Sequence, residues 1–398
     1  MNLLFLLAAA AAFLLCFCKR ARAEEDPCPV PEDLMKLSDP DYEADDRALA
    51  AVLRRAEAGE DLTVALIGGS ITMGTVSAGS EDDKYPPREP YAVLFFDWWQ
   101  KTFPRCRFTF VNAGIGGTDS YLGVHRAAKD VLEKAPDLVL VEFSVNDDGS
   151  EFCRYSYDSL VRTLLKAPSA PAVMLLFMAQ TDGTTAQAAH RTVGRGYALP
   201  SVSCADVFMA MIRGGKRTAA ALSGDQVHPS ALGHRVTAAL LIRSLERVRA
   251  KCASLPAPVP FALPPVTEER YPCCHIEDSL NAAVLDCGGF RKGSDSEFYR
   301  NGWTCPEANG KGISFAADCA RLGILYLKTV DGKSGSAEIL VDGARIAVLD
   351  ADFTGGWGNA VAACEVLAAD RTERHAVTVR PLNGQFILLG LLVTVIPG

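Results

Sequence analysis

The sequence predicts a two-domain protein in which a three-layer α/β domain with a parallel sheet is followed by an all-β domain. Short apolar segments alternate with helical segments over residues 60–250, as in a parallel sheet covered by helices on both faces. A proline-rich stretch over 255–268 ends this pattern. Beyond it, alternating apolar segments are separated by Asp-Gly and Asn-Gly pairs, which is typical of an antiparallel sandwich or jelly roll.

The elements of the first domain follow from hydrophobic periodicity. Continuous apolar runs predict strands buried on both faces, and amphipathic runs between and after them predict helices. The strands are expected at 62–67, 107–112, 137–143, 172–178 and 200–203. The helices are expected at 90–102, 120–134, 157–166, 185–197 and 230–251.

The N-terminal 23 residues are expected to be a targeting segment. Their apolar run over 3–18 is shorter than the roughly 20 residues that span a bilayer. Ala21 and Ala23 form the small-x-small pattern of a signal-peptidase site. We expect a cleaved secretory signal and a secreted or extracytoplasmic protein. An uncleaved membrane anchor is the alternative, because three basic residues follow the run and none precedes it.

The proline-rich stretch divides the rest of the chain into two predicted domains and a linker. The predicted catalytic domain covers 24–254, the linker 255–268 and the β-domain 269–398. A formal net charge of −8 argues against nucleic acid as a partner, because such partners need a basic surface. The sequence contains no pair of cysteines with CxxC spacing, which argues against a zinc site.

Cysteines are frequent, with 13 in the chain. In the oxidising compartment that the leader implies, some are expected to pair, although the sequence does not choose the connectivity. Six of them crowd the last third of the chain: Cys273, Cys274, Cys287, Cys305, Cys319 and Cys364.

Polar residues follow the predicted strands at the edge where an open α/β sheet carries its chemistry. Ser70 follows the first strand after a glycine pair, and the turn NAGIGG, which contains Gly117, follows the second. Asn146 follows the third strand, and the sequence DQVHP, with Asp225 and His228, precedes the last helix. These blocks are therefore expected to meet.

Each of these residues has a role in ester hydrolysis. The Ser70 hydroxyl becomes a nucleophile when a base takes its proton, and a histidine such as His228 suits that task near neutral pH. Asp225 can hold the His228 imidazole in the required tautomer. The backbone N–H groups of Ser70 and Gly117 and the side-chain amide of Asn146 can donate to the oxyanion of a tetrahedral intermediate.

In this order over about residues 60–250, the four blocks resemble the SGNH, or GDSL-type, hydrolase family. The family's serine, glycine, asparagine and histidine match Ser70, Gly117, Asn146 and His228, and its triad aspartate matches Asp225. The resemblance implies a flavodoxin-like α/β/α hydrolase domain with an appended C-terminal β-domain. It also implies a serine esterase that forms an acyl-enzyme and needs no metal or organic cofactor.

One position departs from the family pattern. Gly69 stands where the first block usually has an aspartate, which puts the support of the serine turn in question, and Asp147 is the expected substitute. We expect an esterase that removes small acyl groups, acetyl first of all, from carbohydrate. The alternatives are a lipid esterase, lysophospholipase or thioesterase, and a glycan-binding protein with a degenerate hydrolase domain. The sequence does not indicate an oligomeric state.

Structural roles are expected for five further residues. His234 lies within the last predicted helix and is expected to pack there rather than act as a second base. Asn112 and Asp119 are expected to brace the glycine-rich turn. Trp303 and Trp357 are expected to pack or anchor turns in the β-domain rather than bind sugar.

Overall fold

The computed structural model describes residues 29–81, 89–354 and 356–397, so the expected leader over 1–23 lies outside the described residues. Within these ranges, no helix has both the length and the apolar character that a bilayer span requires.

The first domain is built on a parallel five-stranded sheet with the order β2-β1-β3-β4-β5. This is the strand order of flavodoxin-like folds, in which the order of strand addition reverses between β1 and β3. The predicted α/β class is confirmed, and each predicted strand is present with its ends shifted by one residue or less, apart from β2, which runs two residues further. The strands are β1 (Leu62–Gly68), β2 (Phe108–Gly114), β3 (Leu138–Glu142), β4 (Ala172–Phe177) and β5 (Ser201–Ser203).

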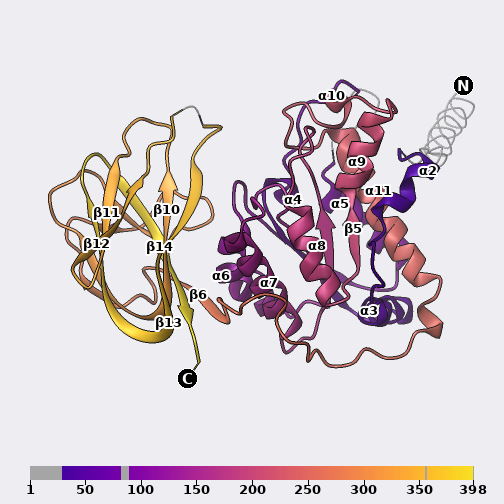
Figure 1. Ribbon diagram of the computed structural model, residues 1–398, viewed down its shortest axis with the longest axis horizontal. Helices are drawn as coiled ribbons and strands as arrows, with labels where there is room; N and C mark the ends of the chain where they lie inside the picture. The colour runs from indigo at the N-terminus through magenta and orange to yellow at the C-terminus, as the bar shows by residue number, and fades with distance from the viewer. Residues whose placement is uncertain (1–28, 82–88, 355, 398) are drawn as a thin grey trace, which may run out of the picture.

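Helices cover both faces of this sheet (Figure 1). Alternate strand residues point to opposite faces. Leu66 therefore joins an apolar cluster with α3, α5, α9 and α11, whereas Ile67 joins a second cluster with α6, α7 and α8. The helices are α2 (Glu32–Met35), α3 (Arg47–Ala58), α4 (Ser70–Met73), α5 (Tyr91–Thr102), α6 (Ser120–Asp130), α7 (Glu151–Leu165), α8 (Gln187–Gly196), α9 (Cys204–Arg213), α10 (Ala219–Leu222) and α11 (Ala231–Arg249), with 3₁₀ turns η1 (Lys36–Ser38), η3 (Leu132–Lys134) and η4 (Cys252–Ser254).

The four-residue helices α2, α4 and α10 were not predicted, and three of the longer helices also differ from the expectation. Helix α7 begins six residues earlier than predicted, because the Ser150 side chain accepts a hydrogen bond from the Cys153 N–H and caps the helix there. Helices α3 and α9 were not predicted. The apolar spacing of α3 and the left-handed Gly59 that ends it were readable from the sequence. The Ser203 cap that begins α9 was readable as well.

The second domain is all-β and antiparallel, as the sequence predicted, and its nine strands join in one hydrogen-bonded sheet. The long strands β10 and β13 pair along most of their length, with a register shift between Cys319 and Arg321 that bends the sheet. The strands are β6 (Cys273–Glu277), β7 (Val284–Asp286), β8 (Arg291–Lys292), β9 (Trp303–Cys305), β10 (Ile313–Lys328), β11 (Ser336–Val341), β12 (Ala344–Asp350), β13 (Ala360–Pro381) and β14 (Phe386–Val395).

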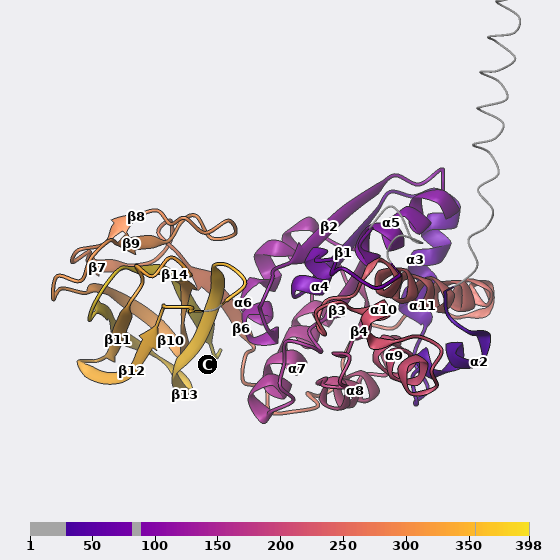
Figure 2. The same ribbon diagram turned by 90° about the horizontal axis from the view of Figure 1, so that it is seen from above.

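The β-domain packs directly on helix α6 of the first domain (Figure 2). Tyr121 of α6 and Leu389 and Leu392 of β14 belong to one continuous apolar cluster. In the same interface, His125 Nε2 lies 3.2 Å from Thr394 Oγ1. This contact is apolar and continuous with the core of the first domain, and it packs the β-domain beside the sheet edge that carries the predicted site.

The ten cysteines that the structure describes are all free thiols. The predicted pairing is therefore wrong for these residues. Cys305 and Cys319 are fully buried in the interior of the β-domain, where a thiol packs as a small apolar group.

Candidate active site

Ser70 begins the short helix α4 directly after strand β1. The Met73 N–H donates to the Gly69 carbonyl oxygen, so the chain turns into the helix one residue after the strand ends. Gly68 permits this turn. A Cβ at Gly68 would lie 2.2 Å from Thr72 Oγ1 and 2.5 Å from the Glu142 carbonyl oxygen.

The structure brings the predicted serine, histidine and aspartate together. His228 Nε2 lies 2.9 Å from Ser70 Oγ, and His228 Nδ1 lies 2.7 Å from Asp225 Oδ2. Partial burial alone would raise the pKa of Asp225. Hydrogen bonds from the His228 ring and from the backbone N–H groups of His228 and Val227 outweigh that effect and lower the pKa. Asp225 is thus an ionised acceptor for the imidazole at neutral pH.

Ser77, which the sequence did not single out, holds the histidine loop against the segment after α4. Its hydroxyl donates to the His228 carbonyl oxygen at 2.5 Å and accepts from the Gly224 N–H at 2.9 Å. Its own N–H donates to the Pro229 carbonyl oxygen. The serine and histidine segments are therefore joined by backbone contacts as well as through the reactive side chains.

Asn146 lies against Gly69, the position that departs from the family pattern. A Cβ at Gly69 would lie 2.1 Å from Asn146 Oδ1, a separation that real atoms do not adopt. The space that an aspartate side chain would need at position 69 is thus filled by the asparagine. Asn146 Oδ1 is buried and has no hydrogen-bond partner among the described residues.

Asp147 does not support the serine turn, so that expectation is wrong. Its carboxylate accepts from the Ser120 N–H at 2.9 Å and from His190 Nε2 at 2.8 Å, and it holds the start of α6 instead. The His190 ring stacks on Tyr157 with 3.6 Å between ring centroids. No local sequence signal relates His190 to Asp147, because the two residues come from different helix–strand units.

The glycine-rich turn is braced as predicted. The Asn112 side chain donates to the Thr72 carbonyl oxygen and accepts from the Gly114 N–H. Asp119 caps α6 by accepting from the Leu122 N–H, and burial raises its pKa to about 6. Gly117 has a φ of +70°, a left-handed conformation that favours glycine.

The β-domain brings an aromatic side chain to this turn. Trp357 is 80% exposed, and its Cζ2 would lie 3.5 Å from a Cβ at Gly117. Together with Asp119, Lys328 and Phe353, it lines a cavity of about 260 Å³ between the domains. Trp357 therefore does not pack in the interior of the β-domain. Its ring meets the edge of Phe353 in the same loop, with 5.1 Å between ring centroids, which fits the turn-anchoring role that was the other expectation.

Trp303 and His234 have the structural roles that were predicted. Trp303 is fully buried in the β-domain. His234 Nδ1 accepts from the Tyr91 N–H, and its Nε2 donates to the Thr75 carbonyl oxygen. Burial lowers the pKa of His234 to about 4, so this ring is neutral at physiological pH.

Two buried charged residues form hydrogen bonds at the carboxyl ends of the strands. Neither was singled out from the sequence. Arg126 donates to the carbonyl oxygens of Ala113 and Gly68, the residues that precede the glycine-rich turn and the serine turn. Glu142 accepts from the N–H and hydroxyl of Ser144. Glu142 could have been noticed in the sequence, because it is a charged residue at the end of the otherwise apolar run of β3.

Glu142 is expected to make the protein less stable as the pH rises from about 4.5 to about 7. Burial raises its pKa in the folded protein from 4.5 to about 7, although hydrogen bonds from Ser144 oppose this shift. Because the unfolded chain loses this proton first, the free energy of unfolding falls across that interval by about 3 kcal/mol. We expect Glu142→Gln to remove this contribution, as measured by urea unfolding at pH 4.5 and pH 7. Equal pH dependence in the two proteins would contradict the prediction.

No group of three or more His, Cys, Asp or Glu side chains within the described ranges could hold a metal ion.

Comparison with known proteins agrees with this geometry. The GDSL-like lipase/acylhydrolase family matches residues 66–236. A two-domain esterase active on acetylated mannans is 31% identical and covers 90% of this chain, while this chain covers 98% of it. The TM-scores are 0.82 for that structure and 0.81 for the same kind of esterase co-crystallised with mannopentaose. The comparison with curated proteins found no match. Because the similarity extends over both domains, the chain belongs to the GDSL-like lipase/acylhydrolase family and is an ester-hydrolysing enzyme of the SGNH type.

Proposed function

We propose that this enzyme removes acetyl groups from carbohydrate, with Ser70 as nucleophile, His228 as general base and acid, and Asp225 as the group that orients His228. The observation that carries the proposal is the hydrogen-bonded series from Ser70 Oγ through the His228 ring to Asp225. It lies at the carboxyl ends of the parallel strands, where open α/β sheets bind their ligands.

The reaction follows from these contacts. His228 Nε2 takes the proton of Ser70 as Oγ attacks the acetyl carbonyl carbon. The protonated ring then gives this proton to the sugar oxygen as the ester C–O bond breaks, which leaves an acetyl group on Ser70. Water attacks the acetyl-enzyme with His228 again as base. Collapse of the second intermediate releases acetate and returns the proton to Ser70.

Three donors are proposed to stabilise the negative oxygen of each intermediate. They are the backbone N–H groups of Ser70 and Gly117 and the side-chain amide of Asn146. The N–H of Ser70 begins a helix, Gly117 lies in the adjacent turn, and Asn146 is held against Gly69. Donors placed in advance for the oxyanion are typically worth about 3 kcal/mol of activation free energy each.

The carbohydrate substrate is supported by the cavity beside Gly117. Its exposed Trp357 offers a flat apolar face to a sugar ring, and the Asp119 carboxyl can accept from sugar hydroxyl groups. The related two-domain esterase is active on acetylated mannans, which supports the same substrate class for this chain.

The substrate class is tested by acetate release from acetylated manno-oligosaccharides, beside hydrolysis of p-nitrophenyl acetate and p-nitrophenyl octanoate. We expect acetate release and a preference for the acetyl over the octanoyl ester, with Ser70→Ala as the blank. A rate that rises with acyl length, without acetate release from the oligosaccharide, would instead identify a lipid esterase.

Trp357→Ala is expected to raise KM for acetylated manno-oligosaccharides about tenfold, because a stacking surface worth about 1 kcal/mol or more is lost. The kcat/KM for p-nitrophenyl acetate should change less than about twofold, since this ester carries no sugar ring to stack on Trp357. Val348→Ala, at another exposed apolar residue of that domain, is the control. Equal KM values for Trp357→Ala and the parent enzyme would refute a sugar contact at Trp357.

We also propose that the enzyme is exported. The support is the apolar run over 3–18 with Ala21 and Ala23 after it. The free thiols of the described cysteines add no support, so the proposal depends on the leader alone. N-terminal sequencing of protein recovered outside the cytoplasm is expected to begin at Glu24, and a sequence beginning at Met1 would refute cleavage.

A further inference from the structure

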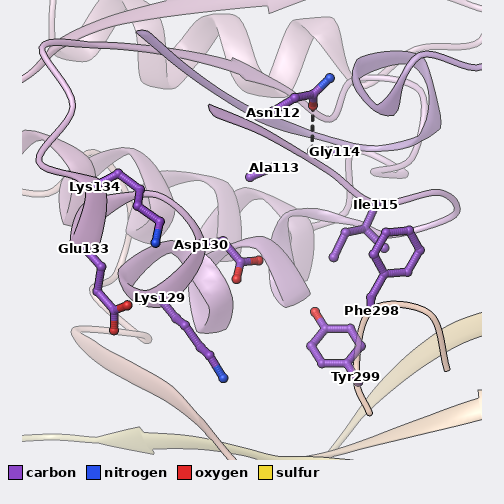
Figure 3. A pocket seen from close by; sticks show the side chains of 10 residues that line it. All are labelled: Asn112, Ala113, Gly114, Ile115, Lys129, Asp130, Glu133, Lys134, Phe298 and Tyr299. Atoms are coloured by element: carbon purple, nitrogen blue, oxygen red, sulfur yellow. Dashed lines mark hydrogen bonds between the residues drawn. The ribbon is translucent and has the colours of Figure 1, made fainter. Parts of the chain in front are cut away.

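A second cavity, of about 440 Å³, lies between the two domains and shares no lining residue with the cavity at Trp357. Its walls come from the end of β2 and the following Ile115, from the end of α6 with η3, and from the β-domain loop that carries Phe298 and Tyr299 (Figure 3). Because both domains contribute, the cavity exists only in the assembled two-domain protein.

Tyr299 has a polar group in this cavity that the protein does not satisfy. Its hydroxyl oxygen is buried and has no hydrogen-bond partner among the described residues, although the residue as a whole is only partly buried. The ring extends from its loop toward the α6 side, with the hydroxyl foremost (Figure 3). Burial raises the pKa of Tyr299, so the hydroxyl remains a donor at neutral pH. Folded proteins rarely leave such a group unpaired, and a ligand hydroxyl would pair with it.

The charges around the cavity balance, which argues against an ionic ligand. Lys129 and Lys134 are matched by Asp130 and Glu133. Asp130 is also paired with the buried Arg126 at 3.1 Å. Beside these groups, Phe298 presents a ring that is 43% exposed. An apolar ring face, an unpaired hydroxyl and no excess charge fit a neutral ligand that carries many hydroxyl groups.

The cavity lies at the start of the turn that flanks Ser70. Ile115 lines the cavity, and a Cβ at the next residue, Gly116, would lie 3.7 Å from Ser70 Cβ. A ligand in the cavity therefore lies along the same turn as an ester held at Ser70. A polymer with one acetylated unit at Ser70 can place another of its units here.

We propose that this cavity is a subsite for a sugar unit of the polysaccharide chain at a distance from the unit being deacetylated. Tyr299 donates to or accepts from a sugar hydroxyl, and Phe298 packs against the ring. The inference rests on the proposed carbohydrate substrate. It predicts that the enzyme distinguishes long from short oligosaccharides through residues that do not touch the ester.

The test compares the parent enzyme with Tyr299→Phe, which removes the hydroxyl alone. For acetylated mannohexaose we expect KM to rise about threefold to tenfold, the effect of losing one neutral hydrogen bond. Kinetics on acetylated mannobiose and p-nitrophenyl acetate should not change. The midpoint of thermal unfolding should stay the same or rise, because an unsatisfied buried group has been removed. An unchanged KM for acetylated mannohexaose would overturn the proposal.

Binding of unacetylated mannohexaose, measured by calorimetry in a Ser70→Ala background, separates this proposal from the proposed function. We expect binding to weaken with Tyr299→Phe and with Phe298→Ala, and to be unchanged with Leu285→Ala, an exposed control in the same domain. Binding that is indifferent to Tyr299 and Phe298 would overturn the subsite even if the enzyme deacetylates mannans. Absence of acetate release from every oligosaccharide, with Tyr299-dependent binding retained, would overturn the proposed function and leave the subsite standing.

Discussion

Replacing His228 with alanine is expected to lower kcat for p-nitrophenyl acetate by about 10⁴- to 10⁶-fold, and Ser70→Ala by a similar factor. The reason is geometric. Among the described residues, the Ser70 hydroxyl forms its side-chain hydrogen bond with His228, whose Nε2 lies 2.9 Å from Ser70 Oγ. Without that base, a neutral serine hydroxyl is a weak nucleophile, and without Ser70 the base has no proton to take.

The two changes should not add. Since Ser70 and His228 act as a unit, the double variant should be about as active as either single variant. Asp225→Asn keeps the shape of the site but favours the wrong histidine tautomer, so we expect a loss of about 10³- to 10⁴-fold in kcat. His275→Ala, at a half-exposed histidine of β6, is the control and should be fully active. Activity of His228→Ala within tenfold of the parent enzyme would contradict this assignment.

Introducing the family's aspartate, as Gly69→Asp, is expected to lower kcat by about 10²- to 10³-fold rather than improve the enzyme. The new Cβ would overlap Asn146 Oδ1, so the asparagine must leave its position. That would remove one proposed oxyanion donor, a loss of about 3 kcal/mol of transition-state stabilisation. The measurement is kcat on p-nitrophenyl acetate, together with thermal unfolding to confirm that the variant folds.

A matched control for this change is available in the adjoining turn. A Cβ at Gly116 meets nothing closer than 3.4 Å, so Gly116→Ala should retain most of the activity. Asn146→Ala should lose about as much activity as Gly69→Asp, and the double variant should lose little more. If Gly69→Asp is as active as the parent enzyme, Asn146 is not held in place by the glycine and the explanation fails.

Much of the first domain could be predicted because its signals are local. A strand buried on both faces must be apolar throughout, so the runs at β1, β3 and β4 were recognisable without any partner. The meeting of Ser70 with His228 could also be predicted. The carboxyl ends of parallel strands face one edge, and polar residues at those ends converge there whatever the packing details.

By itself, then, the sequence determined the order of the two domains, the class of each and the residues that meet at the sheet edge. Only the tertiary structure decided that Asn146 fills the space beside Gly69, and that Trp357 and Tyr299 line interdomain cavities. The hydrophobic periodicity of the sequence indicates which side chains along one helix or strand are buried, because that pattern follows the local repeat of the backbone. It does not indicate which distant helix or strand will lie against those side chains. In this protein, the packing of the β-domain against α6 decides which residues face each other between the domains.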